Sequence, residues 1–572
     1  MRTKTIILTS LVSFLFCLDG LAVDAETVQT GSTNGNFVSK LLSRASDSDV
    51  DEKNFAIEDK YSAEFVIEGN TVIDSKDLYE ITRDYHGRVL DGKELEAAAN
   101  LITQEYWNRG YITSLAHTPW QNRDDGKGRI AIIEGRLGDV TIKHVNDNER
   151  FAKFNRFNDK FINRYLTKSA KESAFNNKNF ERGLLLLNEY PTLDVTAALS
   201  KGKEPGTSDV VITAKEKKLP LKASVFVNNH GSRYTGHIRT GASLDIINPT
   251  TLGDTFSMMG TLAPEENSNT MHFYKFSYNI PVGPWGTKLF LGYSRMKYEI
   301  DKEFNSLGTE SSGRTRSIGI THPFIKSRDK NLSMNLGLRK KNYTNYMFER
   351  VYRTSKDVYS ALDIGVTGDM VKPGQHAFVA LNTSTGLGSA FGGLTTPEYS
   401  ESSRPGKATG SWTKVNLDVT YIKTLLKKGR LIARGSGQFA TSSVVIGEQF
   451  SIGGPESVRG YGAGEFLGDH GYFVSAEVRT PFWYKEIGYK EKKLKADNYI
   501  NWAFFIDHAQ TFYEKELSGD RDVPLTSVGL GLRANALNNK FSFKLDLALP
   551  ITGEEPSDKK DARVWAYMSL EY

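Results

Sequence analysis

Cysteine is almost absent from this chain. Among 572 residues it occurs once, at Cys17. That residue lies in a segment, 1–25, that reads as a secretory signal, with two basic residues ahead of a short apolar run at 6–18. With the signal removed and the mature chain beginning near Glu26, no thiol would remain. This absence excludes a disulfide framework, thiolate metal sites and cysteine nucleophiles.

Long apolar runs and a strong charge of one sign are also lacking. After the signal, no stretch approaches the roughly 18 continuous apolar residues that a membrane-spanning helix needs. The net charge is +5, from 73 Lys and Arg against 68 Asp and Glu, and no basic block indicates nucleic-acid binding. Glycine is frequent, at 51 residues, and aromatic residues make up 11%. This composition fits either a soluble β protein or a transmembrane β-barrel, whose strands are only weakly apolar.

No common catalytic motif stands in the sequence. It contains no HExxH and no GxSxG, and "RPGKAT" at 404–409 lacks the spacing of a phosphate-binding loop. His508 beside Asp507 could suggest acid–base chemistry. Alternation along its strand instead places His508 on the outer face, where an interfacial histidine is the simpler interpretation. We therefore expect no enzyme activity, no metal site and no cofactor.

The segment after the signal, 26–60, is polar apart from one amphipathic patch. Its apolar residues recur at helical spacing within "NFVSKLLSRA", at Phe37, Val38, Leu41 and Leu42. The acidic stretch "SDSDVDEKN" that follows is typical of a flexible linker. We expect one short helix on a tether.

Two stretches of about 80 residues then repeat one order of elements. In 61–137 a strand is followed by two helices and two strands, and the second helix has Asp91 as its N-cap and Gly110 as its stop. The same order, strand, two helices and two strands, recurs in 138–219. A single α+β domain of coincidental order is the alternative. We favour two small α/β modules.

From residue 220 onward helical periodicity gives way to strands of alternating polarity. In "NKFSFKLDLALP", for example, Phe543 and Leu545 face one way and Lys544 and Asp546 the other. Sixteen such segments follow one another, and their connectors alternate loosely between short and long. They start near 221, 235, 253, 271, 285, 312, 331, 354, 374, 407, 428, 470, 498, 523, 539 and 560. An even number of strands with short turns at one end and longer loops at the other is typical of an outer-membrane barrel.

The last segment supports closure of that barrel. "ARVWAYMSLEY" alternates from Val564 to the terminal Tyr572, with apolar residues on one face. A spanning sheet must pair its last strand with its first, because an open edge is not stable in lipid. We therefore predict a closed barrel over 220–572, with a long inserted loop at 443–469.

Several stretches together resemble the two-partner secretion transporters (TpsB type, the haemolysin secretion/activation proteins), which are related to the outer-membrane barrel-assembly proteins. "LITQEYWNRGYITSLAHTPWQ" with "IAIIEGRLGDVTI" resembles the family's first POTRA module, and "LLLLNEYPTLDVTAALSKGKEPGTSDVVI" the second. "SVRGY" resembles its barrel-inserted loop tip, and "FIDHA" its Phe-x-Asp-x-Gly strand motif, with Ala509 in place of the glycine. The resemblance implies a transmembrane β-barrel of 16 antiparallel strands preceded by two periplasmic α/β POTRA modules and a short N-terminal helix.

The resemblance also implies that the 443–469 loop folds into the barrel. Its tip is Val458, Arg459, Gly460 and Tyr461. By alternation Phe505, Asp507 and Glu477 point inward. We therefore predict an ion pair between Arg459 and Asp507 that sets the position of the loop more than the stability of the barrel. In the alternative, Arg459 is solvated and Asp507 pairs with another cation.

The resemblance carries further expectations about site residues. POTRA residues that could recognise the partner are Gly110, Tyr111, Gln121, Glu134 and Gly135. Phe37, Leu41 and Leu42 belong to the helix that would plug the barrel at rest.

The implied function is secretion of a large partner exoprotein across the outer membrane of a Gram-negative bacterium. The partner would be an adhesin, haemolysin, toxin or haem-binding protein with an N-terminal secretion domain. A barrel of this kind would also contact outer-membrane lipid and depend on the barrel-assembly machinery for its own insertion. We expect a monomer. A barrel-assembly factor is the alternative, and a diffusion porin is a third class, although it would not need about 195 residues of periplasmic domain.

Overall fold

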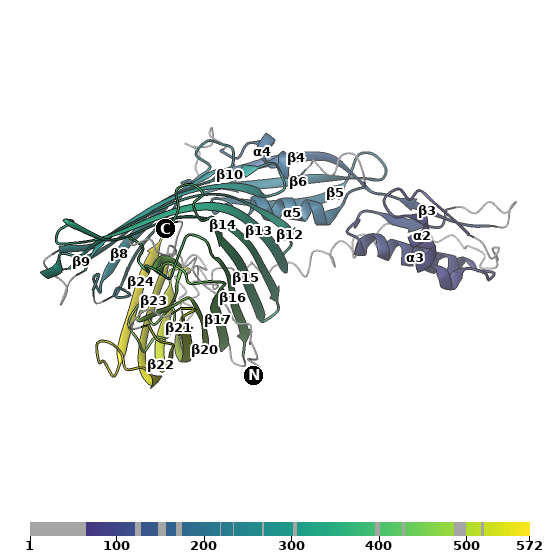
Figure 1. Cartoon of the computed structure of the whole chain (residues 1–572). Coiled ribbons are helices and arrows are strands. Elements are labelled where there is room, and N and C mark those ends of the chain that lie inside the picture. The colour runs from purple at the N-terminus through teal and green to yellow at the C-terminus, as the bar shows by residue number, and fades with distance from the viewer. Residues whose placement is uncertain are drawn as a thin grey trace. The chain divides into compact units, whose positions relative to one another are not determined.

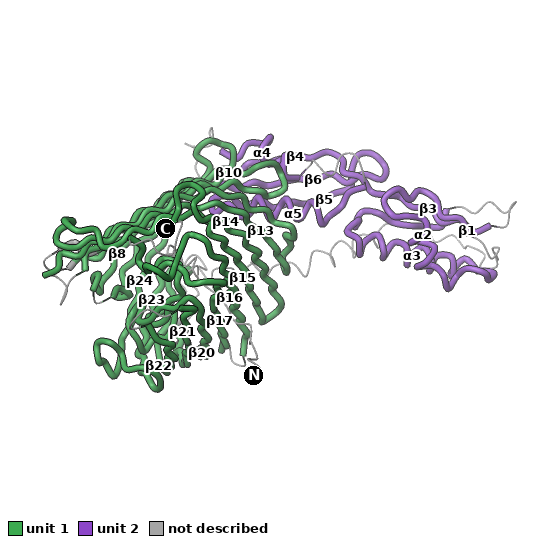
Figure 2. Tube along the Cα trace, in the orientation of Figure 1, with its two compact units in different colours: residues 1–22, 219–572 green, residues 23–218 purple. Residues whose placement is uncertain are grey.

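The computed structural model describes most of the chain after the N-terminal segment. The described residues are 65–119, 127–146, 156–166, 174–217, 219–232, 234–265, 268–300, 306–394, 401–425, 429–484, 499–515 and 520–572. The predicted signal, the predicted helix around Phe37, Leu41 and Leu42, and Gln121 lie outside them. Contacts divide the described residues into two compact units, one within 23–218 and one within 219–572 (Figure 2).

The unit within 23–218, purple in Figure 2, contains two modules, and module 1 pairs a small sheet with two α-helices. Its elements are β1 (Phe65–Glu68), α2 (Ser75–Ile81), the 3-10 turn η2 (Arg83–Tyr85), α3 (Gly92–Asn108), β2 (Leu115–His117) and β3 (Gly128–Ile133). The helix α3 begins with a capping box between Asp91 and Glu94 and ends just before Gly110, whose φ is +100°, so both predicted ends of this helix are confirmed. Its buried face, which includes Leu95 and Ile102, forms the core against the sheet.

Module 2 repeats that architecture. It consists of β4 (Arg136–Asn146), α4 (Asp159–Leu166), α5 (Asn177–Leu187), β5 (Leu193–Lys201) and β6 (Thr207–Glu216). The sheet order is β1-β3-β2 in module 1 and β4-β6-β5 in module 2, and in each the first pair is parallel and the second antiparallel. The repeat predicted from the order of elements is thus present in the topology. Figure 1 labels α2, α3 and β3 of module 1 and all five elements of module 2.

The unit within 219–572, green in Figure 2, is a closed barrel of sixteen antiparallel strands. They are β7 (Leu221–Asn228), β8 (Arg239–Ile247), β9 (Thr255–Glu265), β10 (Ser268–Val282), β11 (Thr287–Glu299), β12 (Glu310–Lys326), β13 (Lys330–Met347), β14 (Tyr352–Lys372), β15 (Gln375–Gly386), β16 (Thr413–Thr424), β17 (Arg430–Ala440), β20 (His470–Tyr484), β21 (Tyr499–Phe512), β22 (Val523–Ala536), β23 (Phe541–Gly553) and β24 (Arg563–Glu571). Pairing of β24 with β7 closes the barrel, which confirms the prediction of closure. The largest error in a predicted strand start is at β16, which begins at Thr413 rather than near 407.

The two faces of the strands divide as alternation predicts. On β21 the outer Phe504 and Ile506 are about half exposed, whereas the inner Phe505 and Asp507 are buried. On the terminal strand Val564, Met568 and Leu570 are exposed, and the intervening Trp565 is buried. Among the described residues, no helix is both long enough and apolar enough to cross a membrane.

Candidate functional site

The connector between β17 and β20, which we call the inserted loop, contains a small hairpin of its own. It begins after Ala440 and contains the 3-10 turn η5 (Ile446–Glu448) and the strands β18 (Phe450–Ile452) and β19 (Phe466–Gly468), which pair with each other. The tip of the loop lies between these two strands. Gly453 has a φ of +92°, and a Cβ there would lie 2.5 Å from the carbonyl oxygen of Gly462, so this turn requires glycine.

Arg459 at the tip is almost completely buried, with 1% of its surface exposed. Its Nε and Nη2 donate to the two oxygens of Asp507, each at 2.8 Å, in a bidentate pair. Its Nη1 donates to Oε2 of Glu477 at 2.6 Å. The guanidinium also lies over the ring of Phe505, 3.3 Å from the centroid. The structure thus brings together four residues that the sequence suggested for this site.

Further polar groups complete what we call the tip cluster. Arg533 bonds both Glu477, at 3.0 Å, and Asp546, at 2.7 Å, and Arg479 donates to Glu477 at 2.7 Å. In formal charge the three arginines balance the three carboxylates. This balance matters because an unpaired charge in such a buried position would be costly. The members of the cluster are Arg459, Glu477, Arg479, Asp507, Arg533 and Asp546.

Apolar and backbone contacts hold the rest of the tip. Val458 and Tyr461 are buried in a small core that also contains Ala509. A Cβ on Gly460 would lie 2.8 Å from the backbone nitrogen of Pro550 on β23, so the tip can approach this wall closely only with glycine there. The indole of Trp565 donates to the carbonyl oxygen of Arg459 at 2.7 Å. Ala509, the departure from the family motif, is fully buried in this core beside the tip.

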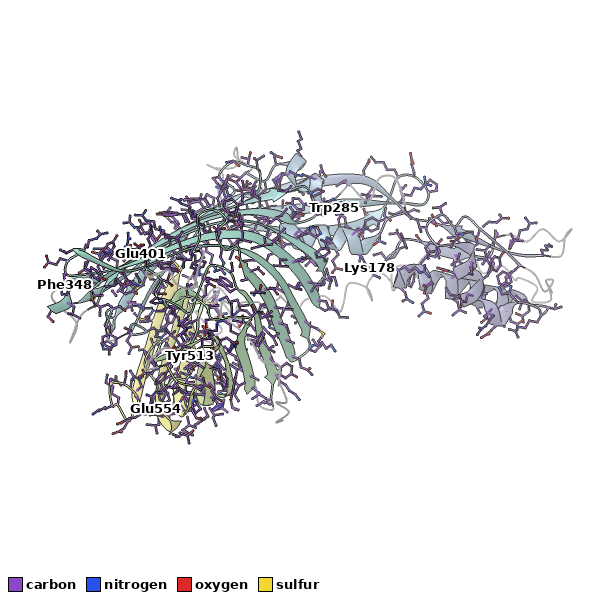
Figure 3. The ribbon with its side chains drawn as sticks, in the orientation of Figure 1. Lys178, Trp285, Phe348, Glu401, Tyr513 and Glu554 are labelled. Carbon is purple, nitrogen blue, oxygen red and sulfur yellow. The ribbon has the colours of Figure 1, made fainter. Side chains whose placement is uncertain are left out.

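Ionic contacts also join the C-terminal end of the inserted loop, at Asp469, to neighbouring connectors. Arg404, in the connector between β15 and β16, donates to Asp469 at 2.6 Å and to Asp520 at 3.0 Å. Its guanidinium lies 5.1 Å from the ring centroid of Tyr513, which Figure 3 labels. Asp469 also accepts from the backbone N–H of Val444 at 3.0 Å. Arg404 therefore joins three separate connectors at one end of the barrel.

In module 1, Glu134 accepts hydrogen bonds from three residues. Its donors are the backbone N–H groups of Thr71, at 2.6 Å, and Val72, at 3.0 Å, the Thr71 hydroxyl, and the Tyr106 hydroxyl at 2.8 Å. Burial acts to raise the pKa of Glu134, but these hydrogen bonds outweigh burial and hold the pKa below its ordinary value. Burial and the same carboxylate raise the pKa of Tyr106. Glu134 therefore holds the β1–α2 connection of its own module.

Gly110 and Gly135, two more of the predicted partner-recognition residues, lie at the junction of the two modules. The carbonyl of Gly110 accepts from Asn177 at 2.8 Å, and that of Gly135 accepts from Phe175 at 2.7 Å. Lys178, labelled at the start of α5 in Figure 3, donates to the carbonyl of Asn108 at 2.7 Å. The last carbonyls of α3 thus meet the first donors of α5, where the two helix dipoles attract. Tyr111 packs edge-on against Tyr106, with 5.9 Å between the ring centroids.

Comparison with protein families identifies this architecture. The model of the haemolysin secretion/activation protein ShlB/FhaC/HecB matches residues 206–533. The chain belongs to this family. A second model, the POTRA domain of ShlB type, matches residues 63–135.

Individual members of the same family are similar over most of their length. The Heme/hemopexin transporter protein HuxB of Haemophilus influenzae (strain 86-028NP) is 22% identical over 96% of each chain. The Outer membrane transporter CdiB of Dickeya dadantii (strain 3937) is 24% identical over 72% of this chain and 71% of its own. The solved structure of CdiB from Escherichia coli has a TM-score of 0.73 at 19% identity over 92% of each chain. That of CdiB from Acinetobacter baumannii has a TM-score of 0.67 at 17% identity, over 94% and 97%.

As a member of the ShlB/FhaC/HecB family, the protein is a two-partner secretion transporter of the outer membrane, with its POTRA modules in the periplasm. The family is one of secretion channels for a large exoprotein rather than one defined by catalysis. The tip of the inserted loop contacts inward-facing residues of the barrel wall, such as Asp507 and Glu477, so it lies in the channel of this transporter.

Sequence reasoning missed some parts of the tip cluster. The alternating polarity of β22 predicts that Arg533 points into the barrel. No pattern in the neighbouring sequence predicts that Arg533 and Arg459 bind the same carboxylate, that of Glu477. The bond from Trp565 joins residues 106 positions apart, and no local pattern predicts it.

Proposed function

We propose that the chain carries an unfolded partner exoprotein from the periplasm through its barrel, and that the inserted loop closes this route at rest. The observation that carries the proposal is the buried, charge-balanced tip cluster that binds Arg459 to the wall. Such a cluster gives the loop one resting position, and the loop leaves it when partner contacts replace those of Arg459. Folding of the partner outside the cell would drive its passage.

Capture of the partner would begin on the POTRA modules, and the structure distinguishes their strand edges. In module 1 the Thr103 hydroxyl bonds both the N–H and the carbonyl of Ala116 on β2, at 2.8 and 3.3 Å. In module 2 the Asn188 side chain does the same to Val195 on β5, at 2.7 and 2.9 Å. Each module thus covers the backbone at one point of an edge strand, module 1 with a side chain of α3 and module 2 with the C-cap residue of α5.

The edge strand β5 extends well beyond Val195, the residue that Asn188 covers. Alternation turns the backbone groups of Ala197 and Leu199 in the same direction as those of Val195, away from β6. In contrast, β2 has only three residues, and its central one is bonded by Thr103. We therefore propose the outer edge of β5 as the place where an extended segment of the secretion domain adds a strand.

A secretion assay tests the overall proposal. The chain is expressed with its genetically adjacent large exoprotein, and the culture medium is assayed for that exoprotein. Export by the wild type is expected, and deletion of 61–137 is expected to abolish it. Normal secretion after that deletion would refute capture by module 1, and no secretion by the wild type would favour a barrel-assembly factor or a plain pore.

A point substitution tests the edge of β5. Leu199→Pro removes a backbone N–H that points away from β6, so the hydrogen bonds between β5 and β6 remain. Leu199→Ala keeps that N–H and serves as the matched control. The proline variant of the full chain should bind the purified secretion domain more weakly than the alanine variant. Equal binding by the two variants would exclude strand addition at this edge.

The partner itself is proposed only by class. It is a large exoprotein of the adhesin, haemolysin, toxin or haem-binding type. Outer-membrane lipid is the proposed contact of the exposed apolar face that includes Phe504 and Leu547. We propose the barrel-assembly machinery as the agent of insertion and a monomer as the working form.

A further inference from the structure

The first turn of the inserted loop carries a second buried charge. Glu448, at the end of η5, has no exposed surface. Arg339 donates to its two carboxylate oxygens at 2.8 and 3.1 Å, and Lys341 and Lys414 approach it at 2.8 and 2.7 Å. The hydroxyl of Tyr359 donates to the same carboxylate at 2.8 Å. Five side chains, up to 109 positions apart in the sequence, therefore meet at this point.

The barrel wall supplies all the cations of what we call the entry cluster, defined as Glu448, Arg339, Lys341, Asp363 and Lys414. Arg339 and Lys341 lie on β13 and Lys414 on β16. Asp363 on β14 pairs with Arg339 at 2.8 Å, so the wall alone carries three cations and one carboxylate. Only the glutamate comes from the loop, and it reduces the formal charge of the cluster from +2 to +1.

Backbone contacts extend the attachment. Lys414 and Gln438 both donate to the carbonyl oxygen of Glu448, at 3.0 and 2.9 Å. Val445, three residues before, is fully buried in the core formed with Tyr359 and Trp412. The entry of the loop is therefore bound through its charge, its backbone and its apolar side chains to β13, β14, β16 and β17. None of these strands contributes to the tip cluster.

We propose that Glu448 is a second positioning residue of the transporter, and that it makes the entry of the inserted loop the fixed end and the tip the releasable end. The charge left on each wall supports this order. Removal of the tip leaves Glu477, Asp507 and Asp546 against Arg479 and Arg533, a formal charge of −1. Removal of the entry leaves +2 in a buried site, and the free energy of an uncompensated charge rises steeply with its size. The tip therefore leaves its wall while Glu448 still holds the entry.

Thiol labelling can test this inference, because Cys17 is the only cysteine and lies in the predicted signal. Val445→Cys reports on the entry and Val458→Cys on the tip, since both positions are fully buried. Each single-cysteine transporter is placed in liposomes, and its rate of reaction with a maleimide is measured. We expect Glu448→Gln to raise the rate at position 445 by about tenfold or more through local opening, with less than about a twofold change at 458.

The same reporters test the order of release. Adding the purified secretion domain of the partner to the otherwise unmodified reporters should raise labelling at position 458 and leave position 445 unchanged. Release of both positions together, or of 445 first, would overturn the inference. Because the order of release rests on the proposed function of the loop, this arm fails if that function is wrong, whereas the effect of Glu448→Gln on position 445 does not depend on transport.

Two further variants serve as controls. Glu456→Gln makes the same change at an exposed carboxylate of the same loop, which pairs with Arg434 at 3.3 Å, and should leave both rates unchanged. If Glu448→Gln prevents assembly of the barrel, the double variant Glu448→Gln/Lys341→Met restores the +1 charge of the cluster without the anchor. It should still show the rise at 445. Unchanged labelling at 445 in a folded variant, judged by heat-modifiable mobility, contradicts a positioning role for Glu448.

Discussion

The entry and the tip of the inserted loop are bound to the barrel with opposite polarity. At the tip the loop contributes a cation, Arg459, and the wall contributes carboxylates; at the entry the loop contributes a carboxylate, Glu448, and the wall contributes cations. A loop with a single buried charge could bind at more than one position along the barrel wall. Because Glu448 and Arg459 are both buried and differ in sign, the loop fits in a single orientation: reversal would bring Arg459 to the cations of the entry cluster and Glu448 to the carboxylates of the tip cluster.

The largest effect is expected from breaking the tip. Arg459→Ala leaves three carboxylates against two arginines in a buried site, and loss of one partner of a buried ion pair costs about 3–5 kcal/mol. We expect secretion into the medium to fall by at least about tenfold, the factor that corresponds to 1.4 kcal/mol. Immunoblots of the culture medium measure the amount of exoprotein secreted. Arg434→Ala, which removes a partly exposed arginine near the same loop, is the control, and equal secretion by both variants would contradict the role of Arg459.

The next test asks whether the two anchors act independently. Because the clusters share no strand, the effects of Glu448→Gln and Arg459→Ala on the free energy of channel opening should add. The frequency of openings is measured in planar lipid bilayers. The double variant should therefore show the product of the two single-variant factors. A double variant no more open than the stronger single variant would mean that the loop releases as one unit.

A smaller effect is expected from the ring beneath the tip. Phe505→Leu keeps an apolar side chain but removes the aromatic face under the Arg459 guanidinium. A cation–π contact is worth about 0.5–2 kcal/mol, so maleimide labelling at Val458→Cys should rise only a few-fold. Phe504→Leu, on the outer face of the same strand, should cause no change. A rise in labelling as large as the rise caused by Arg459→Ala in the same reporter would show that the ring, rather than the carboxylates, holds the tip.

The smallest effect is expected at Ala509. Its methyl group is fully buried beside Val458 and Tyr461. Ala509→Gly restores the residue of the family motif and removes one buried carbon, worth about 0.8 kcal/mol. The melting temperature of the heat-modifiable band should fall slightly while secretion remains normal. Improved stability would show instead that alanine strains this strand.

The two anchors also differ in how far they could be predicted. The tip was accessible because "SVRGY" and "FIDHA" resemble family motifs and because alternation places Phe505 and Asp507 inside. At the entry, alternation along β13 puts the buried Arg339 on the face opposite the exposed Leu336, but Glu448 lies in a connector without periodicity. Its bond to Arg339 joins residues 109 positions apart, and no repeat or turn signal indicates which connector residue will meet which strand.

The amino-acid sequence by itself determined the elements of this protein. Helical spacing and capping residues such as Asp91 produced the repeated modules, and a period of two along sixteen strands assigned each residue to the lipid or the lumen face, because these patterns act within a few positions of the chain. Only the tertiary structure decided which inward residues meet. Barrel closure sets the register of every strand, and the path of the inserted loop then brings Arg459 to Asp507 and Glu448 to Arg339, because a buried charge needs a partner of opposite sign even when that partner is far away in the sequence.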